Sequence, residues 1–311
     1  MNYQFVKKAD DLVTTYEQTR AGFLSIALEK NMVSDPYVKR ALAFKSLVAK
    51  TSVPDDLITL KEVRPFMLTA AGLSDKSMSY LSEDDKTKAI TELIEKFLKP
   101  AGENYIDEII YRYLLIKGDA VGGTMRNRIG ALGQEKLVRS LLSCMNVMGF
   151  DYQWLPNNSS TWQNKKDSDL DIEKRLKVLS WKNDKGDRTL GFNLKVPIVG
   201  KNVDICLFKA LSFDYNVSDP KTILMLGELK GGIDPAGADE HWKTANSALE
   251  RIRVAFKNKQ LPIQTSFIGA AIAKDMAKEI FQQLKNGTID YAANLTDTNQ
   301  LTDYCNWILT L

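Results

Sequence analysis

Three charged residues in two apolar runs have the types and spacing of a catalytic site. Glu228 and Lys230 end the run TILMLGELK, and Asp204 lies in KNVDICLF, 24 residues before Glu228. Side chains alternate along a strand, so Glu228 and Lys230 would point to the same side. Two carboxylates offer the oxygen ligands that Mg²⁺ prefers, and a neighbouring ammonium can orient water or balance phosphate charge. If the strands are neighbours, the pattern favours metal-assisted phosphodiester hydrolysis.

A structural interpretation competes with this one. Glu-x-Lys tripeptides are common, so Glu228 and Lys230 could form an exposed ion pair at a strand end while Asp204 caps a turn. Both runs are strongly apolar, however, and we expect them to be buried. A charged group in a buried strand needs a partner, which favours a shared site.

His241 is the only histidine in the chain and follows the turn-rich stretch GGIDPAGADE. We expect that stretch to reverse the chain and return His241 to the same sheet edge. An imidazole with an unperturbed pKa of about 6.5 is suited to accept a proton from an attacking water. The alternative is a histidine with a purely structural role in the core or at the surface.

Composition narrows the class of protein. The 311 residues carry a net charge of +3, which neither marks nor excludes a nucleic-acid-binding protein, because metal-site carboxylates would mask a basic surface. No window approaches 18 uninterrupted apolar residues, so the sequence does not support a membrane span, and the N-terminus lacks the apolar centre of a secretory signal. The three cysteines (Cys144, Cys206 and Cys305) have no zinc-site spacing and are expected to be reduced core residues of a cytoplasmic protein.

Apolar periodicity divides the chain into two parts. Residues 1–117 are predicted to form a helical region, with Ser82 as the N-cap of a helix that ends before Pro100. Residues 118–311 are predicted to form an α/β domain with a mixed sheet flanked by helices. The expected strands are KVLSW, TLGFNLKVPIVG, KNVDICLF, TILMLGELK and PIQTSFIGAAIA.

The remaining segments of the second part are assigned by composition. A glycine cluster at 118–133 is expected to lead into a long helix, and the polar residues 151–175 to form a surface loop. A helix capped by Asp239 is expected at about 240–256. A last helix, KDMAKEIFQQLK, is expected before a short C-terminal tail.

Asp204 with Glu228-Leu229-Lys230 resembles the PD-(D/E)xK nuclease motif, although Pro197 lies too far upstream to complete its left half. Three longer strings together resemble the AvaI/BsoBI family of type II restriction endonucleases, with similarity from about residue 60 to the end of the chain. They are TAAGLSDKSMSYLSEDDK, GDAVGGTMRNRIGALGQEKLVR and GELKGGIDPAGADEHWKT.

The resemblance implies an activity and its partners. A homodimer would encircle duplex DNA, with the helical region 1–117 contributing, and the nuclease core 118–311 would cut both strands with Mg²⁺, leaving 5′-phosphates. The family reads the degenerate palindrome C-Y-C-G-R-G. In such a restriction-modification system a cognate DNA methyltransferase acts on the same site without necessarily binding the endonuclease.

The resemblance also implies roles for single residues. Asp204 and Glu228 would be metal ligands, Lys230 the catalytic lysine, and His241 the candidate general base. Asp234 matches a base-contacting residue, which fits a carboxylate accepting from a cytosine amino group. Lys76 matches a second recognition residue that would donate to guanine O6/N7, although an exposed lysine before a helix is an equal alternative.

Further residues have less specific assignments. Arg126 and Arg128 are expected near the DNA backbone, with the surrounding glycines allowing close packing. Glu135 is a candidate outer carboxylate of the metal site. The polar run 163–167 is either a DNA-contacting loop or a solvated one.

Three other functions stay open on the sequence. They are a catalytically inactive DNA-binding protein of the nuclease fold, a structure-specific repair nuclease, and an interaction protein in which Glu-x-Lys has no catalytic meaning. The inactive DNA-binding protein would show no Mg²⁺-dependent cutting. The repair nuclease would give a smear in place of discrete fragments, and the interaction protein would have no affinity for DNA.

Overall fold

The computed structural model describes residues 4–166, 170–212 and 215–311. The chain divides into two compact units, one of residues 1–23 with 129–311 and one of residues 24–128. The units separate inside two long helices, α1 (Tyr16–Val48) and α5 (Tyr105–Met148). The expected boundary at 117/118 also lies inside α5. The assignment of DNA encirclement to one part and catalysis to the other stays a prediction.

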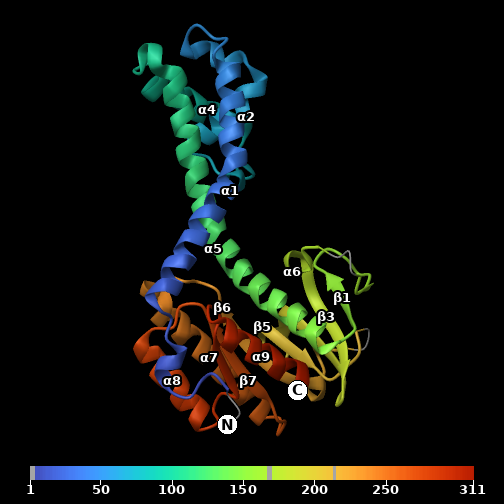
Figure 1. The fold of residues 1–311 in the computed structure, drawn as a ribbon. Helices are drawn as coiled ribbons and strands as arrows, with labels where there is room; N and C mark the ends of the chain where they lie inside the picture. Colours follow the sequence, from blue (N-terminus) through green and yellow to red (C-terminus); the bar gives the residue numbers. More distant parts are fainter. Residues whose placement is uncertain (1–3, 167–169, 213–214) are drawn as a thin grey trace. The chain divides into compact units, whose positions relative to one another are not determined.

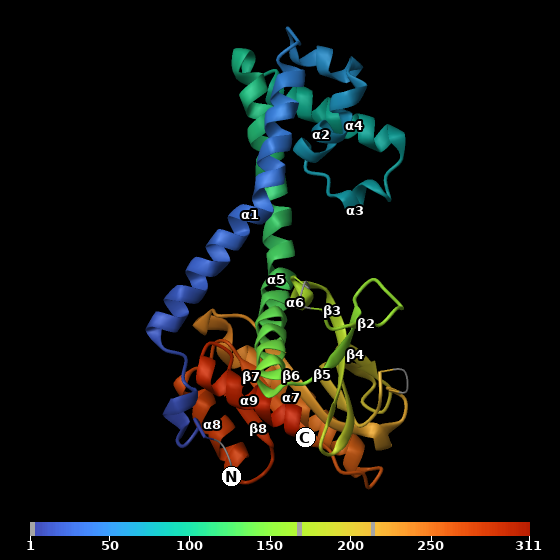
Figure 2. The same cartoon turned by 45° about the vertical axis from the view of Figure 1, so that its right-hand side comes forward.

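The unit of residues 24–128 is helical, as predicted. Besides its parts of α1 and α5 it contains α2 (Arg64–Ala70), α3 (Asp75–Met78) and α4 (Glu83–Leu93). Ion pairs Lys45–Asp107 and Glu29–Arg128 show that the parts of α1 and α5 within this unit run antiparallel, side by side (Figures 1 and 2). The predicted N-cap of α4 is confirmed, because the Ser82 hydroxyl accepts from the Asp85 backbone N–H and completes a capping box.

An eight-stranded mixed sheet forms the other unit, which confirms the predicted fold class. The strand order is β2-β1-β3-β4-β5-β6-β7-β8, antiparallel up to β6 and parallel from β6 to β8. The five predicted strands are β3 (Leu176–Asn183), β4 (Gly186–Val196), β5 (Lys201–Phe208), β6 (Ile223–Lys230) and β7 (Gln264–Gly269). The parallel strands are connected through α7 (Ala238–Lys257) and α8 (Lys274–Lys285).

Helices cover both faces of this sheet. Phe267 of β7 meets Trp242 of α7 edge-on, at 5.0 Å between ring centroids. The preceding residue, Ser266, hydrogen-bonds Tyr304 of α9 (Thr298–Thr310). Since neighbouring strand residues point to opposite faces, α7 lies on one face and α9 on the other.

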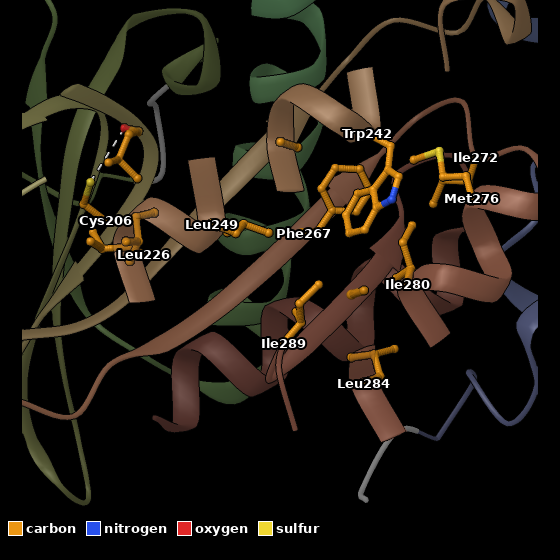
Figure 3. Packing of buried hydrophobic residues seen from close by; sticks show 14 of the residues in the cluster. Cys206, Leu226, Trp242, Leu249, Phe267, Ile272, Met276, Ile280, Leu284 and Ile289 are labelled. Carbon is orange, nitrogen blue, oxygen red and sulfur yellow. Dashed lines mark hydrogen bonds between the residues drawn. The ribbon is translucent and has the colours of Figure 1, made fainter. Parts of the chain in front are cut away.

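The core on the α7 face holds this helix against the sheet. Figure 3 shows Trp242, Leu249 and Phe267 packed with residues of α8, including Ile280. Leu249 and Phe267 are completely buried. The close packing sets the position of α7, whose other face borders the charged residues described below.

Four expectations about local structure were wrong. The glycine cluster does not precede a helix but lies within α5, which runs unbroken for 44 residues. The expected loop at 151–175 contains β1 (Tyr152–Pro156), β2 (Gln163–Asn164) and α6 (Ile172–Arg175), while Asp167 and two neighbours lie outside the described residues. The expected C-terminal tail contains β8 (Tyr291–Asn294) and α9. Helix α7 begins at Ala238, so Asp239 lies in its first turn instead of capping it.

Tertiary contacts explain these differences. β1 is only five residues long but pairs along its length with β3, and β8 is a buried four-residue edge strand beside β7. Helical backbone tolerates glycine at about 1 kcal/mol per residue, which packing elsewhere along α5 can offset.

Two expectations from composition can be compared with the structure. All three cysteines are free and buried, as predicted. Within the described ranges, no helix combines the length and apolar character needed to cross a membrane.

Leu249→Ala tests the packing of α7. The leucine is completely buried in the core cluster, so its truncation should lower the free energy of unfolding by about 2–5 kcal/mol. Chemical denaturation measures this value. Lys257→Ala, exposed on the same helix, should change it by less than about 0.5 kcal/mol. A similar small effect for Leu249→Ala would contradict the described packing.

Candidate active site

The antiparallel pairing of β5 with β6 brings the predicted carboxylates together. Ile205 pairs with Gly227, so the residues next to them, Asp204 and Glu228, lie side by side across the two strands. The backbone N–H of Leu229 donates to Asp204 Oδ2 at 2.9 Å and orients that carboxylate. The expected adjacency of the two runs is therefore confirmed.

Lys230 lies against both carboxylates. Its Nζ is 2.8 Å from Glu228 Oε2 and 3.3 Å from Asp204 Oδ2. The side chain of Glu228 is only 7% exposed, against 22% for Lys230 and 26% for Asp204. The structural interpretation, an ion pair on an exposed strand end, does not describe this cluster, because the glutamate is buried and all three groups meet.

Burial and mutual contact shift the pKa values of this cluster. Burial, together with the neighbouring Asp204, raises the pKa of Glu228 to about 7, and Lys230 offsets part of that rise. Burial alone would lower the pKa of Lys230, but Asp204 and Glu228 outweigh it and raise this pKa. The lysine is therefore protonated at neutral pH, while the glutamate is the group most easily changed by pH or by a bound cation.

The residues fit a divalent metal ion. Two ionised carboxylates and one ammonium leave a net charge of −1 in a cluster with little exposure, and a hard cation would neutralise it. Among the residues that the structure describes, no three His, Cys, Asp or Glu side chains gather as a metal site. Asp204 and Glu228 would thus supply two ligands, and water or substrate oxygens would complete the coordination.

Beside the carboxylates runs an open groove of about 560 Å³. The end of the β4–β5 hairpin lines one side, and α7 lines the other through Thr244, Ala248 and Arg251. Sequence analysis did not single out these α7 residues. They lie three, seven and ten residues after His241, a spacing that places all of them on one helix face and could have indicated them.

Close backbone packing fixes the chain directly after Lys230. A Cβ on Gly231 would lie 2.8 Å from the carbonyl oxygen of Ile129 in α5, and one on Gly133 would lie 2.7 Å from Gly231 Cα. Only glycines permit this approach. The expected role of the α5 glycines in close packing thus holds at Gly133. Glu135, two residues further along α5, is buried, and its role as an outer carboxylate stays a prediction.

His241 occupies the first turn of α7, partly buried. Its ring lies over the loop that follows Lys230, because a Cβ on Gly232 would be 2.9 Å from His241 Cε1. It precedes Thr244 by three residues on the helix face that borders the groove. The hydrogen bonds of the site join Asp204, Glu228 and Lys230 but do not include His241.

The predicted DNA-binding residues have different surroundings. Lys76 is exposed on α3, and Arg126 is exposed on α5. Arg128 is partly buried and forms an ion pair with Glu29. Asp234 is exposed, and its Oδ1 accepts from the Ala236 backbone N–H at 2.9 Å, which fixes the carboxylate in the turn after β6.

Comparison with known proteins identifies the family of the chain. The family model described as "Restriction endonuclease BsobI" matches residues 3–311. The chain belongs to the BsobI restriction endonuclease family. It is 48% identical to the type II restriction enzyme AvaI of Nostoc sp., over all of both chains. It is 49% identical to the type II restriction enzyme BsoBI of Geobacillus stearothermophilus, over 98% of this chain and 97% of the relative.

The raised pKa of Glu228 predicts a pH-dependent stability in metal-free protein. The folded protein keeps a proton on Glu228 up to a pH of about 7, whereas the unfolded chain releases it near the ordinary value of 4.5. Folding therefore takes up a proton between these values, and stability should fall by roughly 1–3 kcal/mol as the pH rises through that window. Denaturation midpoints across this window measure the effect.

Glu228→Gln should remove this part of the pH dependence and be more stable than the wild type at pH 8. Glu240→Gln, at an exposed position of α7, should keep the wild-type slope. A glutamine variant at position 228 with the same pH dependence as the wild type would show that Glu228 is not the group responsible.

Proposed function

We propose that this member of the BsobI restriction endonuclease family is a Mg²⁺-dependent type II restriction enzyme that cuts both strands of duplex DNA at C-Y-C-G-R-G and leaves 5′-phosphates. As a type II restriction enzyme it is a site-specific deoxyribonuclease that hydrolyses phosphodiester bonds. Identity of 48–49% to AvaI and BsoBI over 97–100% of their lengths supports the activity. The observation that carries the chemistry is the contact of Lys230 with Asp204 and with the buried Glu228.

Each residue of the cluster has a defined task. Asp204 and Glu228 would hold Mg²⁺, which when bound supplies Lewis-acid polarisation of the phosphoryl oxygen and a more acidic water. Lys230 keeps its proton because its pKa is raised, so its ammonium offsets the charge that develops on the phosphate. His241, on the groove face of α7, accepts the proton of the attacking water.

Recognition of the site requires donors and acceptors placed in the major groove. In this proposal Lys76 donates to guanine O6/N7, and Asp234 accepts from a cytosine amino group. The exposure of both side chains supports these roles. Arg126 and Arg128 contact the phosphate backbone, which adds affinity without reading sequence.

The assembly follows from the symmetry of the target. A palindromic site has a twofold axis, so a homodimer places one active site on each strand. The partner is double-stranded DNA, and a cognate DNA methyltransferase would protect the same site in host DNA. We place the enzyme in the cytoplasm, where the endonuclease and the methyltransferase would both have access to DNA.

Plasmid digestion tests the function. Purified protein with Mg²⁺ should convert a sequenced plasmid into discrete fragments, and end-sequencing should give C-Y-C-G-R-G with 5′-phosphates. Glu228→Ala should cut at least 10²-fold more slowly, since it removes a metal ligand and leaves Lys230 without its closer partner. A smear of fragments would instead indicate a nuclease without site specificity, and no cutting by folded protein would contradict the proposal.

His241→Ala tests the general base. The single-turnover cleavage rate should fall by about 10²–10⁴-fold, with DNA affinity within about twofold of the wild type, because His241 acts on the water and not on binding. Rapid-quench kinetics and binding titrations separate the two quantities. A rate within tenfold of the wild type would show that another group takes the proton.

A further inference from the structure

The groove beside the carboxylates is lined by three cations that the cleavage chemistry described above does not use, namely Lys195, Lys201 and Arg251. Lys195 precedes Val196, the residue opposite Lys201, and so points to the other face of the sheet from Lys201. Lys201 begins β5, Arg251 lies in the last third of α7, and both line the groove together with Asp204 and Glu228. Both residues are exposed. Across the described residues, neither side chain takes part in a hydrogen bond or an ion pair, so neither serves the fold through such a contact.

Strand pairing sets the direction of Lys201. It lies directly opposite Val196 in the β4–β5 ladder, and residues opposite one another point to the same face of a sheet. Val196 is completely buried in the core cluster that also contains Leu249 of α7. The Lys201 side chain therefore lies on the α7 face of the sheet.

Helix periodicity sets the direction of Arg251. It follows Thr244 and Ala248 at intervals that keep all three on one face of α7, and all three line the groove. The central position of this face is an alanine, which leaves space opposite the carboxylates. Lys201 and Arg251 thus stand on the two walls, one on the sheet and one on the helix.

The charge distribution suits a chain of phosphates. The cluster of Asp204, Glu228 and Lys230 carries −1 when fully ionised, and a Mg²⁺ held there would act on the scissile phosphate. Lys201 and Arg251 add two positive charges with no carboxylate of their own, on the walls beside that point. A DNA strand presents one negative charge at each nucleotide, so phosphates next to the scissile one would meet these cations.

We propose that Lys201 and Arg251 bind the phosphates that flank the scissile phosphate on the cut strand, and so hold that strand in the groove. This inference rests on the proposed nuclease function. Lysine binds phosphate as a point charge, whereas arginine can bind two of its oxygens at once. Such contacts raise affinity for all DNA sequences alike, in contrast to the base contacts proposed for Lys76 and Asp234.

Salt-dependent DNA binding tests this inference. Full-length wild type and the variants Lys201→Gln and Arg251→Gln are titrated by fluorescence anisotropy, without divalent metal, against a C-Y-C-G-R-G duplex and a scrambled duplex over a range of salt concentrations. Each variant should reduce the slope of log K against log salt by about 0.9, the value for one lost phosphate contact. The affinity ratio of the two duplexes should stay within twofold of the wild type.

Two control variants separate charge from other effects. Arg251→Lys keeps the charge and should keep the slope. Lys257→Gln removes a positive charge six residues further along α7, about 240° round the helix, and should also keep the slope. An unchanged slope in Lys201→Gln and Arg251→Gln would overturn the inference.

Neutral phosphates locate the contact. A methylphosphonate has no charge for a cation to bind. When it replaces the phosphate that Arg251 contacts, the duplex should bind Arg251→Gln and the wild type equally tightly. The same should hold for Lys201→Gln at the phosphate that Lys201 contacts. A variant defect that persists with every neutralised phosphate would place the contact elsewhere and overturn the inference. Failure of the proposed function is distinguishable, because the wild type itself would then not cut the C-Y-C-G-R-G duplex with Mg²⁺, whatever the salt slopes of the variants.

Discussion

The β5–β6 ladder is the constraint on which the site depends. It holds two carboxylates and one ammonium close together in a largely apolar sheet, where each charge alone would be costly. Lys230 compensates for only one of the two carboxylates. Glu228, the most buried of the three, consequently has a raised pKa. This excess of negative charge favours a bound cation. The pairing of β5 with β6 is what brings the two carboxylates together.

Helix α7 couples the core to that site. One face packs through Trp242 and Leu249 against the sheet, and the other lines the groove through Thr244, Ala248 and Arg251. Because the apolar face of α7 is buried against the sheet, this packing also fixes the position of the residues of α7 that line the groove. The glycine contact between α5 and Gly231 supports the opposite end of the site, directly after Lys230.

Prediction from sequence succeeded where a local pattern is strong. Strands β3 to β7 have continuous apolar runs bounded by turns, and α8 has a clear apolar stripe, so their existence follows from periodicity. It failed for β1 and β8, which are short, and for α5, whose glycines resemble a loop. These elements form because neighbouring strands and helices supply the missing stability, and no local pattern records such partners.

The sequence by itself determined the chemical groups of this protein: two carboxylates and a lysine in apolar runs, with a histidine after the turn. Their types and spacing sufficed to predict a metal-dependent nuclease, and the longer strings sufficed for the family. Only the tertiary structure decided that Glu228 is buried, that Lys230 contacts both carboxylates, and that Lys201 and Arg251 share their groove. The physical reason is that burial and convergence depend on which strands and helices pack together, and that is a property of long-range contacts.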